Sequence, residues 1–390
     1  MAAQSVVRAK EDRRLWGKPA AQTVDLPFLA LVLLLLTLGL VMLYSASYAQ
    51  SEYDTGYAIS TKYLQKQGAC ALIGLAAMFF FSRIPVRFWY RLAWPLYGVS
   101  IVLLLSVLVI GQEVNGAKRW INLAGIQFQP SEVAKFTMIL LFARLTRRYG
   151  QDAKRFRYGV LGFGMALMGI LLPLALEKHL SAILLMGMVA VVMMFVAGTS
   201  PKWLLIGAAA AVVFVLVYIQ FMGYAGDRVS AWLHPEQDPG DTGYQILQSL
   251  YAIGAGGLFG LGFGKSRQKY LYLPFQYNDY IFAICCEELG LVGALAIVAL
   301  FAVTILRGYW IALHARDRFS TVLASGLVTL IAVQTILNLC VVTNLLPSTG
   351  ISLPFFSYGG TALAVNLGEM GIVLQISRYR NHRKLQEEPL

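Results

Sequence analysis

Long apolar runs separated by short polar stretches make up most of this chain. The runs are about 20 residues long, enough for an α-helix to cross roughly 30 Å of hydrocarbon. They lack the short alternating segments that are typical of membrane β-strands. The pattern therefore predicts an all-α polytopic membrane protein with ten transmembrane helices. The predicted spans are 27–48, 67–82, 92–111, 129–146, 158–176, 180–198, 203–222, 278–306, 320–345 and 355–377.

Composition agrees with this pattern. Of the 390 residues, 58% are hydrophobic and 13% are charged, whereas soluble domains contain about a quarter charged residues. The chain divides into a polar tail over 1–26, a membrane domain over 27–377 and a second polar tail over 378–390. The first span exceeds the apolar part of a signal peptide, so we expect it to be retained. Residues 223–276 form a long loop between helices 7 and 8, and loops of that length usually carry function.

The basic residues predict the orientation. With the N-terminus in the cytoplasm, most of the 32 Lys and Arg residues fall in tails and loops on the inner side. Both termini are then cytoplasmic, and the loop over 223–276 is extracellular. The same bias accounts for the net charge of +12, because a basic inner surface faces anionic lipid. Nucleic acid is therefore not expected as a partner. The four cysteines lack metal-ligand spacing and are expected to be small apolar fillers.

Two motifs lie within the predicted extracellular loop. GYQILQSLYAIG puts Ile246, Leu247, Leu250 and Tyr251 on one helical face, which predicts a short helix at the membrane interface. The glycine-rich run GAGGLFGLGFGKSRQK follows it. A phosphate-binding loop would need glycine where this chain has Phe259, and no strand precedes the run. We therefore expect compact re-entrant backbone here, without a nucleotide or other organic cofactor.

The span over 129–146 begins with QPSEVAKF, in which Glu132 and Lys135 lie one helical turn apart. Ionised groups are costly in lipid, so both are expected to face a protein or water-filled cavity. A satisfied ion pair that only holds two helices together is the alternative. Gln129 and Ser131 stand at the same helix start, which the proline between them also favours.

Further polar residues gather at the same predicted outer face. Lys118 and Arg119 precede the fourth span, Asp279 opens the eighth span, and an uncharged loop over 345–360 leads into the tenth. Arg and Lys side chains suit the phosphates of an anionic lipid head group. A carboxylate such as Asp279 suits the role of general base. The pattern predicts an outward-facing polar cavity.

Simpler interpretations of these residues stay open. Asp279 could be only the N-cap of its helix, and Arg119 could be an interfacial anchor beside Trp120. Glu287 and Glu288 lie two to three turns deeper than Asp279 in the eighth span. Glu369 lies in the tenth span, about 20 Å below the outer end, and is interpreted as structural.

Four ordered motifs carry a resemblance to a known family: KRWINLAGIQFQPSEVAKF, DPGDTGYQILQSLYAIGAGGLFGLGFGKSRQKYLYLP, NDYIFAICCEELG and TGISLPFFSYGGTAL. In these motifs, and over about residues 27–378, the chain resembles the SEDS family (shape, elongation, division and sporulation). SRQKYLYLP is more similar to its division and sporulation branch than to its elongation branch.

This resemblance implies a peptidoglycan glycosyltransferase of the bacterial cytoplasmic membrane. Such enzymes polymerise lipid II, an undecaprenyl-pyrophosphate disaccharide-pentapeptide, at the outer face. Their partners are a class B penicillin-binding protein with transpeptidase activity and other divisome proteins. Asp279 matches the family's essential aspartate and would deprotonate the 4-hydroxyl of the acceptor sugar.

The remaining site residues receive hypothetical roles within that scheme. Arg119 and Lys135 would steady the pyrophosphate. Glu132 would orient Lys135 or help to hold a divalent cation such as Mg²⁺ or Mn²⁺, whose identity stays open. The further candidates for substrate binding are Lys118, Gln129, Ser131, Gln248, Ser357 and Tyr358.

The chain departs from the family pattern in three places. Phe275 stands where a carboxylate is usual, Glu177-Lys178-His179 falls where Gln-Pro-Asp-Leu-Gly is common, and Glu369 falls where an apolar residue is usual. Two rival functions therefore stay open. One is a lipid II flippase, which would need a polar path to the cytoplasmic side. The other is a non-catalytic scaffold that recruits the transpeptidase.

Overall fold

Helices lie at nine of the ten predicted spans, and the described start of the remaining span, 203–222, is helical as well. The computed structural model describes residues 23–114, 117–123, 126–207, 209, 230–237 and 242–379, so most of that one span lies outside the described residues. The helices at predicted spans are α2 (Leu26–Asp54), α3 (Lys62–Phe81), α4 (Val86–Ile110), α5 (Pro130–Tyr149), α6 (Phe163–Leu176, preceded by a π-turn over Arg157–Gly162), α7 (Leu180–Val196), α11 (Ile281–Leu313), α12 (Arg318–Val342) and α13 (Gly360–Ser377). Short 3₁₀ turns cover Gly150–Lys154 and Pro235–Gln237.

Length and apolar composition make this a membrane protein. Within the described residues, six helices are long and apolar enough to cross a bilayer, and α7 is a shorter apolar helix. Two of the six start at an aspartate cap. The Asp25 carboxylate accepts a hydrogen bond from Phe28 N (3.0 Å), and Asp317 accepts one from Ser320 N (3.1 Å). These caps satisfy backbone donors that a helix start leaves without an intrahelical partner.

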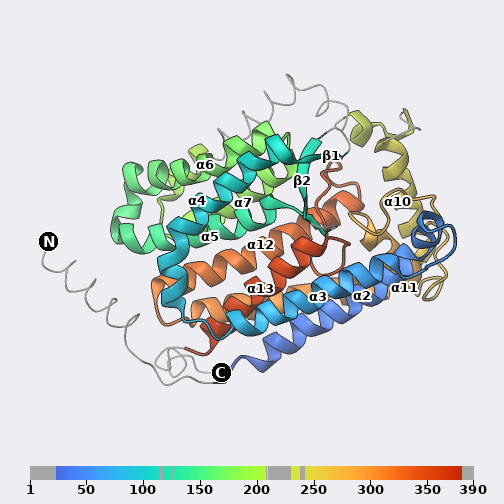
Figure 1. Cartoon of the computed structure of the whole chain (residues 1–390), viewed down its shortest axis with the longest axis horizontal. Coiled ribbons are helices and arrows are strands. Elements are labelled where there is room, and N and C mark those ends of the chain that lie inside the picture. The colour runs from blue at the N-terminus through green and yellow to red at the C-terminus, as the bar shows by residue number, and fades with distance from the viewer. Residues whose placement is uncertain are drawn as a thin grey trace, which may run out of the picture.

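The helices lie side by side as a bundle with α12 and α13 towards its middle (Figure 1). In α12, 78% of the apolar window is buried, compared with 22% in α3. Small residues allow close packing around α13. A Cβ atom at Gly371 would lie 2.4 Å from the backbone oxygen of Met78 in α3. Helices in membranes pack closely where glycine lets their backbones approach.

A small antiparallel sheet lies between α4 and α5, and the all-α prediction missed it. Its strands are β1 (Gln112–Val114), β2 (Ala117–Leu123) and β3 (Ile126–Phe128), in the order β1-β2-β3. Trp120 pairs with Gln112, and Ile121 pairs with Phe128. The strands are too short for their alternating pattern to stand out beside long apolar runs. The sheet gives Lys118 and Arg119 a fixed backbone.

The predicted interfacial helix is present as α10 (Thr242–Gly256). Ile246, Ser249 and Ala252 are buried, whereas Tyr251 is 58% exposed. The buried side of α10 packs against α11 at very short distance. A Cβ atom at Gly256 would lie 2.0 Å from the backbone oxygen of Cys286. Small side chains suit such a contact better than the large apolar face does.

The glycine-rich run fills a break in α11, which confirms the prediction of compact re-entrant backbone. Gly290 has φ 68° and ψ −171°, so the helix is interrupted there. Leu261 N and Gly262 N donate to the backbone oxygens of Glu287 and Glu288. In return, Leu291 N and Val292 N donate to the backbone oxygens of Gly257 and Leu258. The loop thus supplies the hydrogen bonds that the interrupted helix cannot make itself.

Candidate active site

The buried ion pair of α5 forms as the sequence predicts. Lys135 Nζ lies 2.8 Å from Glu132 Oε2, and both side chains are buried. Gln129 occupies the N-cap position of α5, without a side-chain cap hydrogen bond. Ser131 is also buried, and its hydroxyl has no hydrogen-bond partner among the described residues. The start of α5 therefore combines a buried cation with a polar group that a ligand can engage.

Arg119 reaches this region from β2. Its Nη2 atom donates to the backbone oxygen of Lys178 (2.5 Å). Burial raises the pKa of the neighbouring Glu177 to about 8, against the opposing effect of Arg119. Burial lowers the pKa of His179 to about 3, and the positive charges of Arg119 and Lys135 add to the effect. At neutral pH both groups are therefore uncharged.

Glu369 on α13 is a further ionisable group in this region. We call Arg119, Glu132, Lys135 and Glu369 the charge cluster. It is 2% exposed, and neither carboxylate oxygen has a hydrogen-bond partner among the described residues. It interacts electrostatically with Lys135 and Glu132. Helix α13 packs against α5, which carries this ion pair, and the interpretation of Glu369 as structural stays a prediction.

Asp279 lies just before α11, whose N-cap is Tyr280 rather than Asp279. Asn338 Nδ2 of α12 donates to the backbone oxygens of Asp279 (2.7 Å) and Ile351 (2.8 Å). A Cβ atom at Gly350 would lie 3.4 Å from Asp279 Oδ2. The loop before α13 thus runs directly past the carboxylate of Asp279.

The same loop joins Asp279 to the charge cluster. Ser181, two residues beyond His179, donates a hydrogen bond from its hydroxyl to the backbone oxygen of Thr349. Thr349 precedes Gly350, which lies against Asp279. Among the described residues, these contacts join the segment 178–181, to which Arg119 donates, to the loop that passes Asp279.

Ser357 and Tyr358 belong to this loop but have contacts of their own. The Ser357 hydroxyl accepts a hydrogen bond from Leu353 N (2.8 Å). Tyr358 N donates to the backbone oxygen of Tyr277, and both rings pack on Tyr63, at centroid distances of 5.0 and 4.5 Å. Tyr277 is two residues from Asp279, so this aromatic group supports the segment that carries the aspartate.

The two remaining candidates lie at the edge of the site. Lys118 is exposed on β2, and Gln248 is half-buried on α10. Within the described residues, no hydrogen bond or ion pair joins either side chain to the charge cluster. Their substrate-binding roles remain predictions.

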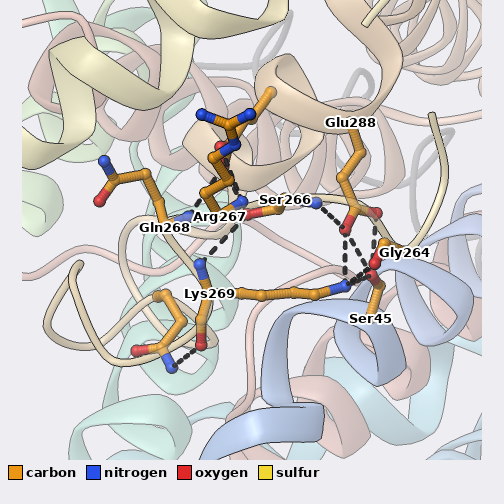
Figure 2. Close-up of polar contacts among 9 residues, drawn as sticks. Ser45, Gly264, Ser266, Arg267, Gln268, Lys269 and Glu288 are labelled. Atoms are coloured by element: carbon orange, nitrogen blue, oxygen red, sulfur yellow. Dashed lines mark hydrogen bonds and ion pairs between the residues drawn. The ribbon is translucent and has the colours of Figure 1, made fainter. Parts of the chain in front are cut away.

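The carboxylate of Glu288 is surrounded by hydrogen-bond partners from α2 and from the loop before α11 (Figure 2). Glu288 Oε1 accepts hydrogen bonds from Ser45 Oγ of α2 (2.7 Å) and from Lys269 Nζ (3.0 Å). Glu287 accepts hydrogen bonds from the Ser266 hydroxyl and from Arg267 N. We call these contacts of Glu287 and Glu288 with Ser45, Ser266, Arg267 and Lys269 the loop clamp. It fixes the segment that leads to Asp279.

Sequence reasoning missed two residues of the site. Asn338 is a fully buried amide in α12, and such a residue marks a required hydrogen bond. That signal was present in the sequence. By contrast, the role of Ser181 could not be seen, because its partner Thr349 is distant in sequence.

A divalent cation finds no suitable ligand set in the described part of the chain. No group of three or more His, Cys, Asp or Glu side chains there could hold a metal ion. Glu132 is engaged with Lys135 instead. The described residues thus do not fit the expected metal.

Comparison with known proteins agrees with the motifs. The family model described as "Cell cycle protein", which covers FtsW, RodA and SpoVE, matches residues 26–382. A "Probable peptidoglycan glycosyltransferase FtsW" of Geobacter sulfurreducens is 40% identical over 358 residues, which cover 90% of this chain and 95% of that protein. Stage V sporulation protein E of Bacillus subtilis is 38% identical over 362 residues, covering 92% and 98%.

Solved structures share the fold. A chain from a peptidoglycan synthase complex that coordinates polymerization and crosslinking matches with a TM-score of 0.78 and 30% identity, covering 92% of this chain and 99% of that one. Thermus thermophilus RodA matches with a TM-score of 0.69 and 28% identity, covering 92% and 98%. The family match spans nearly the whole chain, and the fold agrees with it. The protein therefore belongs to the SEDS family, the family of FtsW, RodA and SpoVE.

Proposed function

We propose that this protein is a peptidoglycan glycosyltransferase that polymerises lipid II into glycan strands. One observation carries the proposal: Arg119 donates to Lys178, and Ser181 in the same segment joins it to the loop that passes the carboxylate of Asp279. The relatives named as peptidoglycan glycosyltransferases support the same substrate class.

The chemistry follows from these groups. Asp279 takes the proton of the 4-hydroxyl of the acceptor sugar, and the resulting oxygen nucleophile attacks C1 of the donor sugar. The new glycosidic bond forms as the bond from C1 to the lipid diphosphate breaks, with inversion at C1. Arg119 and Lys135 bind the diphosphate and stabilise the negative charge that develops on it. The hydroxyl of Ser131 is available to the same group as a donor.

The setting of this reaction is part of the proposal. We infer that both termini face the cytoplasm and that Asp279 lies at the outer face of the bacterial cytoplasmic membrane, as the basic residues predict. A class B penicillin-binding protein would crosslink the strands, and other divisome proteins would accompany it. The similarity to a chain of a peptidoglycan synthase complex supports a partner of this kind.

Asp279→Asn tests the role of the base. The substitution keeps the size of the side chain and removes its ability to take a proton, so polymerisation of purified lipid II should fall at least about 100-fold. Asp152→Asn, the same change in the 3₁₀ turn after α5, should leave the rate unchanged. The product is measured as glycan chains on a gel, with and without a penicillin-binding protein. Full-length product from Asp279→Asn would rule out Asp279 as the base.

The rival functions predict other outcomes. If the protein is a flippase, both the wild type and the Asp279→Asn variant would move lipid II across liposome membranes. If the protein is a non-catalytic scaffold, the Asp279→Asn variant would restore growth of a strain depleted of the wild-type protein. The glycosyltransferase proposal requires that the variant fail to restore growth while it still accumulates in the membrane.

A further inference from the structure

Two arginines of α5 lie on one aromatic ring of α4, at the opposite end of α5 from Glu132 and Lys135. The guanidinium carbon of Arg144 is 4.8 Å from the centroid of the Tyr90 ring, and that of Arg147 is 4.9 Å from the same centroid. Cations are attracted to the faces of aromatic rings within about 6 Å. Two like charges brought onto one ring repel each other, so this arrangement favours an anion beside them.

A proline in α4 holds one of these arginines in place. Pro95 lies inside α4 and has no N–H group, so the backbone oxygen of Arg91, four residues earlier, lacks its usual intrahelical donor. Arg144 Nη1 donates to this oxygen (3.3 Å) and to that of Tyr90 (2.8 Å). Among the described residues, Arg144 makes no hydrogen bond through Nε or Nη2 and no ion pair with a carboxylate. The guanidinium group is therefore fixed by one nitrogen, and its other two can bind a ligand.

Two described acids near this end of the bundle have contacts within their own elements. Asp152, in the 3₁₀ turn after α5, forms an ion pair with the residue three positions further on (3.6 Å). Asp317 starts α12, and the ring of Phe319 brings that helix to the Tyr90 ring (centroid distance 5.3 Å). The Asp317 carboxylate accepts a hydrogen bond from the backbone of its own helix (3.1 Å). Neither acid supplies a printed counter-ion for the arginine that Pro95 fixes.

The surface of α4 beyond the Tyr90 ring is apolar and exposed. Trp94, one turn further on, is 44% exposed, and Val102, two turns beyond that, is 66% exposed. Between them, a Cβ atom at Gly98 would meet no atom within 4 Å. The helix is long and apolar enough to cross a bilayer, and tryptophan prefers the boundary between head groups and hydrocarbon. An anion on the two arginines would thus lie at the level of phospholipid head groups, with open helix surface beside its acyl chains.

We propose that Tyr90, Arg144 and Arg147 form a binding site for the phosphate of an anionic phospholipid. The two arginines donate charge-assisted hydrogen bonds to the phosphate oxygens, and the acyl chains lie along α4 past Trp94. Basic pockets between transmembrane helices at the cytoplasmic side are typical sites for such head groups. With the orientation inferred above, the site lies in the cytoplasmic leaflet. It is a second ligand site, on the opposite side of the membrane from Asp279, and it does not depend on the glycosyltransferase reaction.

The test measures lipid binding to the full-length protein in detergent by native mass spectrometry. Phosphatidylglycerol and phosphatidylcholine with identical acyl chains are the two probes, so they share their apolar part and differ in head-group charge. Wild type should bind phosphatidylglycerol at least about fivefold more tightly. Arg147→Gln keeps the contacts of Arg144 with α4, and it should lose about fivefold in affinity for phosphatidylglycerol alone. Equal affinity of the wild type for the two lipids overturns the proposal.

Arg83→Gln is the matched control. The Arg83 guanidinium also lies on a ring, 3.6 Å from the centroid of Phe79, but at a different place on the same side of the membrane. A diffuse attraction of anionic lipid to the basic surface would weaken equally in both variants. The proposed site instead requires that Arg83→Gln stay within about twofold of the wild-type affinity. Equal losses in Arg147→Gln and Arg83→Gln therefore overturn the proposal. So does displacement of the lipid by an equimolar concentration of inorganic phosphate, because the ligand would then be a free anion.

A wild-type measurement decides the case in which Arg147→Gln does not fold. Phosphatidylglycerol with a photoreactive group near its phosphate is crosslinked to wild-type protein in nanodiscs, and the labelled peptides are identified. Labelling should concentrate at the ends of α4 and α5 that carry Tyr90 and Arg147, whereas phosphatidylcholine with the same group should label those ends no more than other lipid-exposed segments. The same distribution of label from both lipids overturns the proposal.

Discussion

Replacing Lys269 by methionine tests whether the loop clamp holds the segment that carries Asp279. Lys269 is 3% exposed, and its ammonium group donates to Glu288 Oε1 (3.0 Å), to the backbone oxygen of Gly264 (2.6 Å) and to Ser45 Oγ (3.2 Å) (Figure 2). Methionine keeps an unbranched side chain of similar length and removes the charge and the donors. Lys269→Met therefore isolates the polar contribution of the clamp.

The expected loss of stability follows from the buried charge of Glu288, which the substitution leaves without its cation. Glu288 is 1% exposed and would lose the cation with which it pairs, although Ser45 Oγ and Ser266 N still donate to it. Removing one partner of a buried ion pair costs about 3–5 kcal/mol, mostly because the other charge stays buried. The double variant Lys269→Met/Glu288→Gln removes that charge too. Its cost should fall to that of lost hydrogen bonds, about 1–3 kcal/mol.

The assay is equilibrium unfolding of the purified protein in mixed detergent micelles, together with polymerisation of lipid II by the folded fraction. Lys265→Met is the matched control, since Lys265 is exposed in the same loop. The control should stay within about 0.5 kcal/mol of wild type. Polymerisation by Lys269→Met should fall more than its folded fraction does, because the segment leading to Asp279 is released. If Lys269→Met behaves like the control, or if the double variant is less stable than the single one, the reasoning about the clamp is refuted.

Two further predictions concern the backbone break and the buried acid. Gly290→Ala should destabilise the protein by about 2 kcal/mol or more, because φ is positive and the new Cβ would lie 2.2 Å from Gly260 N; Gly254→Ala, which meets no atom within 4 Å, is the control in the same unfolding assay. For Glu177, a pKa raised from 4.5 to about 8 means that the folded state binds more protons than the unfolded state between these values. Stability should therefore fall as pH rises from 5 to 8, by about 3 kcal/mol, and Glu177→Gln should abolish that loss in unfolding measured across this range. Equal pH dependence in both proteins would contradict the burial of Glu177 as the cause.

The hydrophobic pattern of the chain is enough to predict most of the fold. Apolar runs long enough to cross a bilayer leave the backbone no alternative to helix, since every polar backbone group must be satisfied within the segment. The pair Glu132 and Lys135 is also visible, because i, i+3 spacing puts two side chains on one helix face. The small sheet escapes prediction because two of its three strands have only three residues each. The close approach of α10 to α11 at Gly256 was not predicted, because its partner Cys286 is distant in sequence.

Contacts between residues far apart in the chain were decided only by tertiary structure. The sequence by itself determined which segments are helical and which polar residues would have to avoid lipid, because both follow from local spacing and the cost of burying charge. It could not reveal that the charge of Lys135 on α5 acts on Glu369 of α13, or that Glu288 pairs with Lys269. These partners depend on how the helices are rotated and packed against one another. Helix rotation is set by the fit of many side chains at once, so no single stretch of sequence contains it.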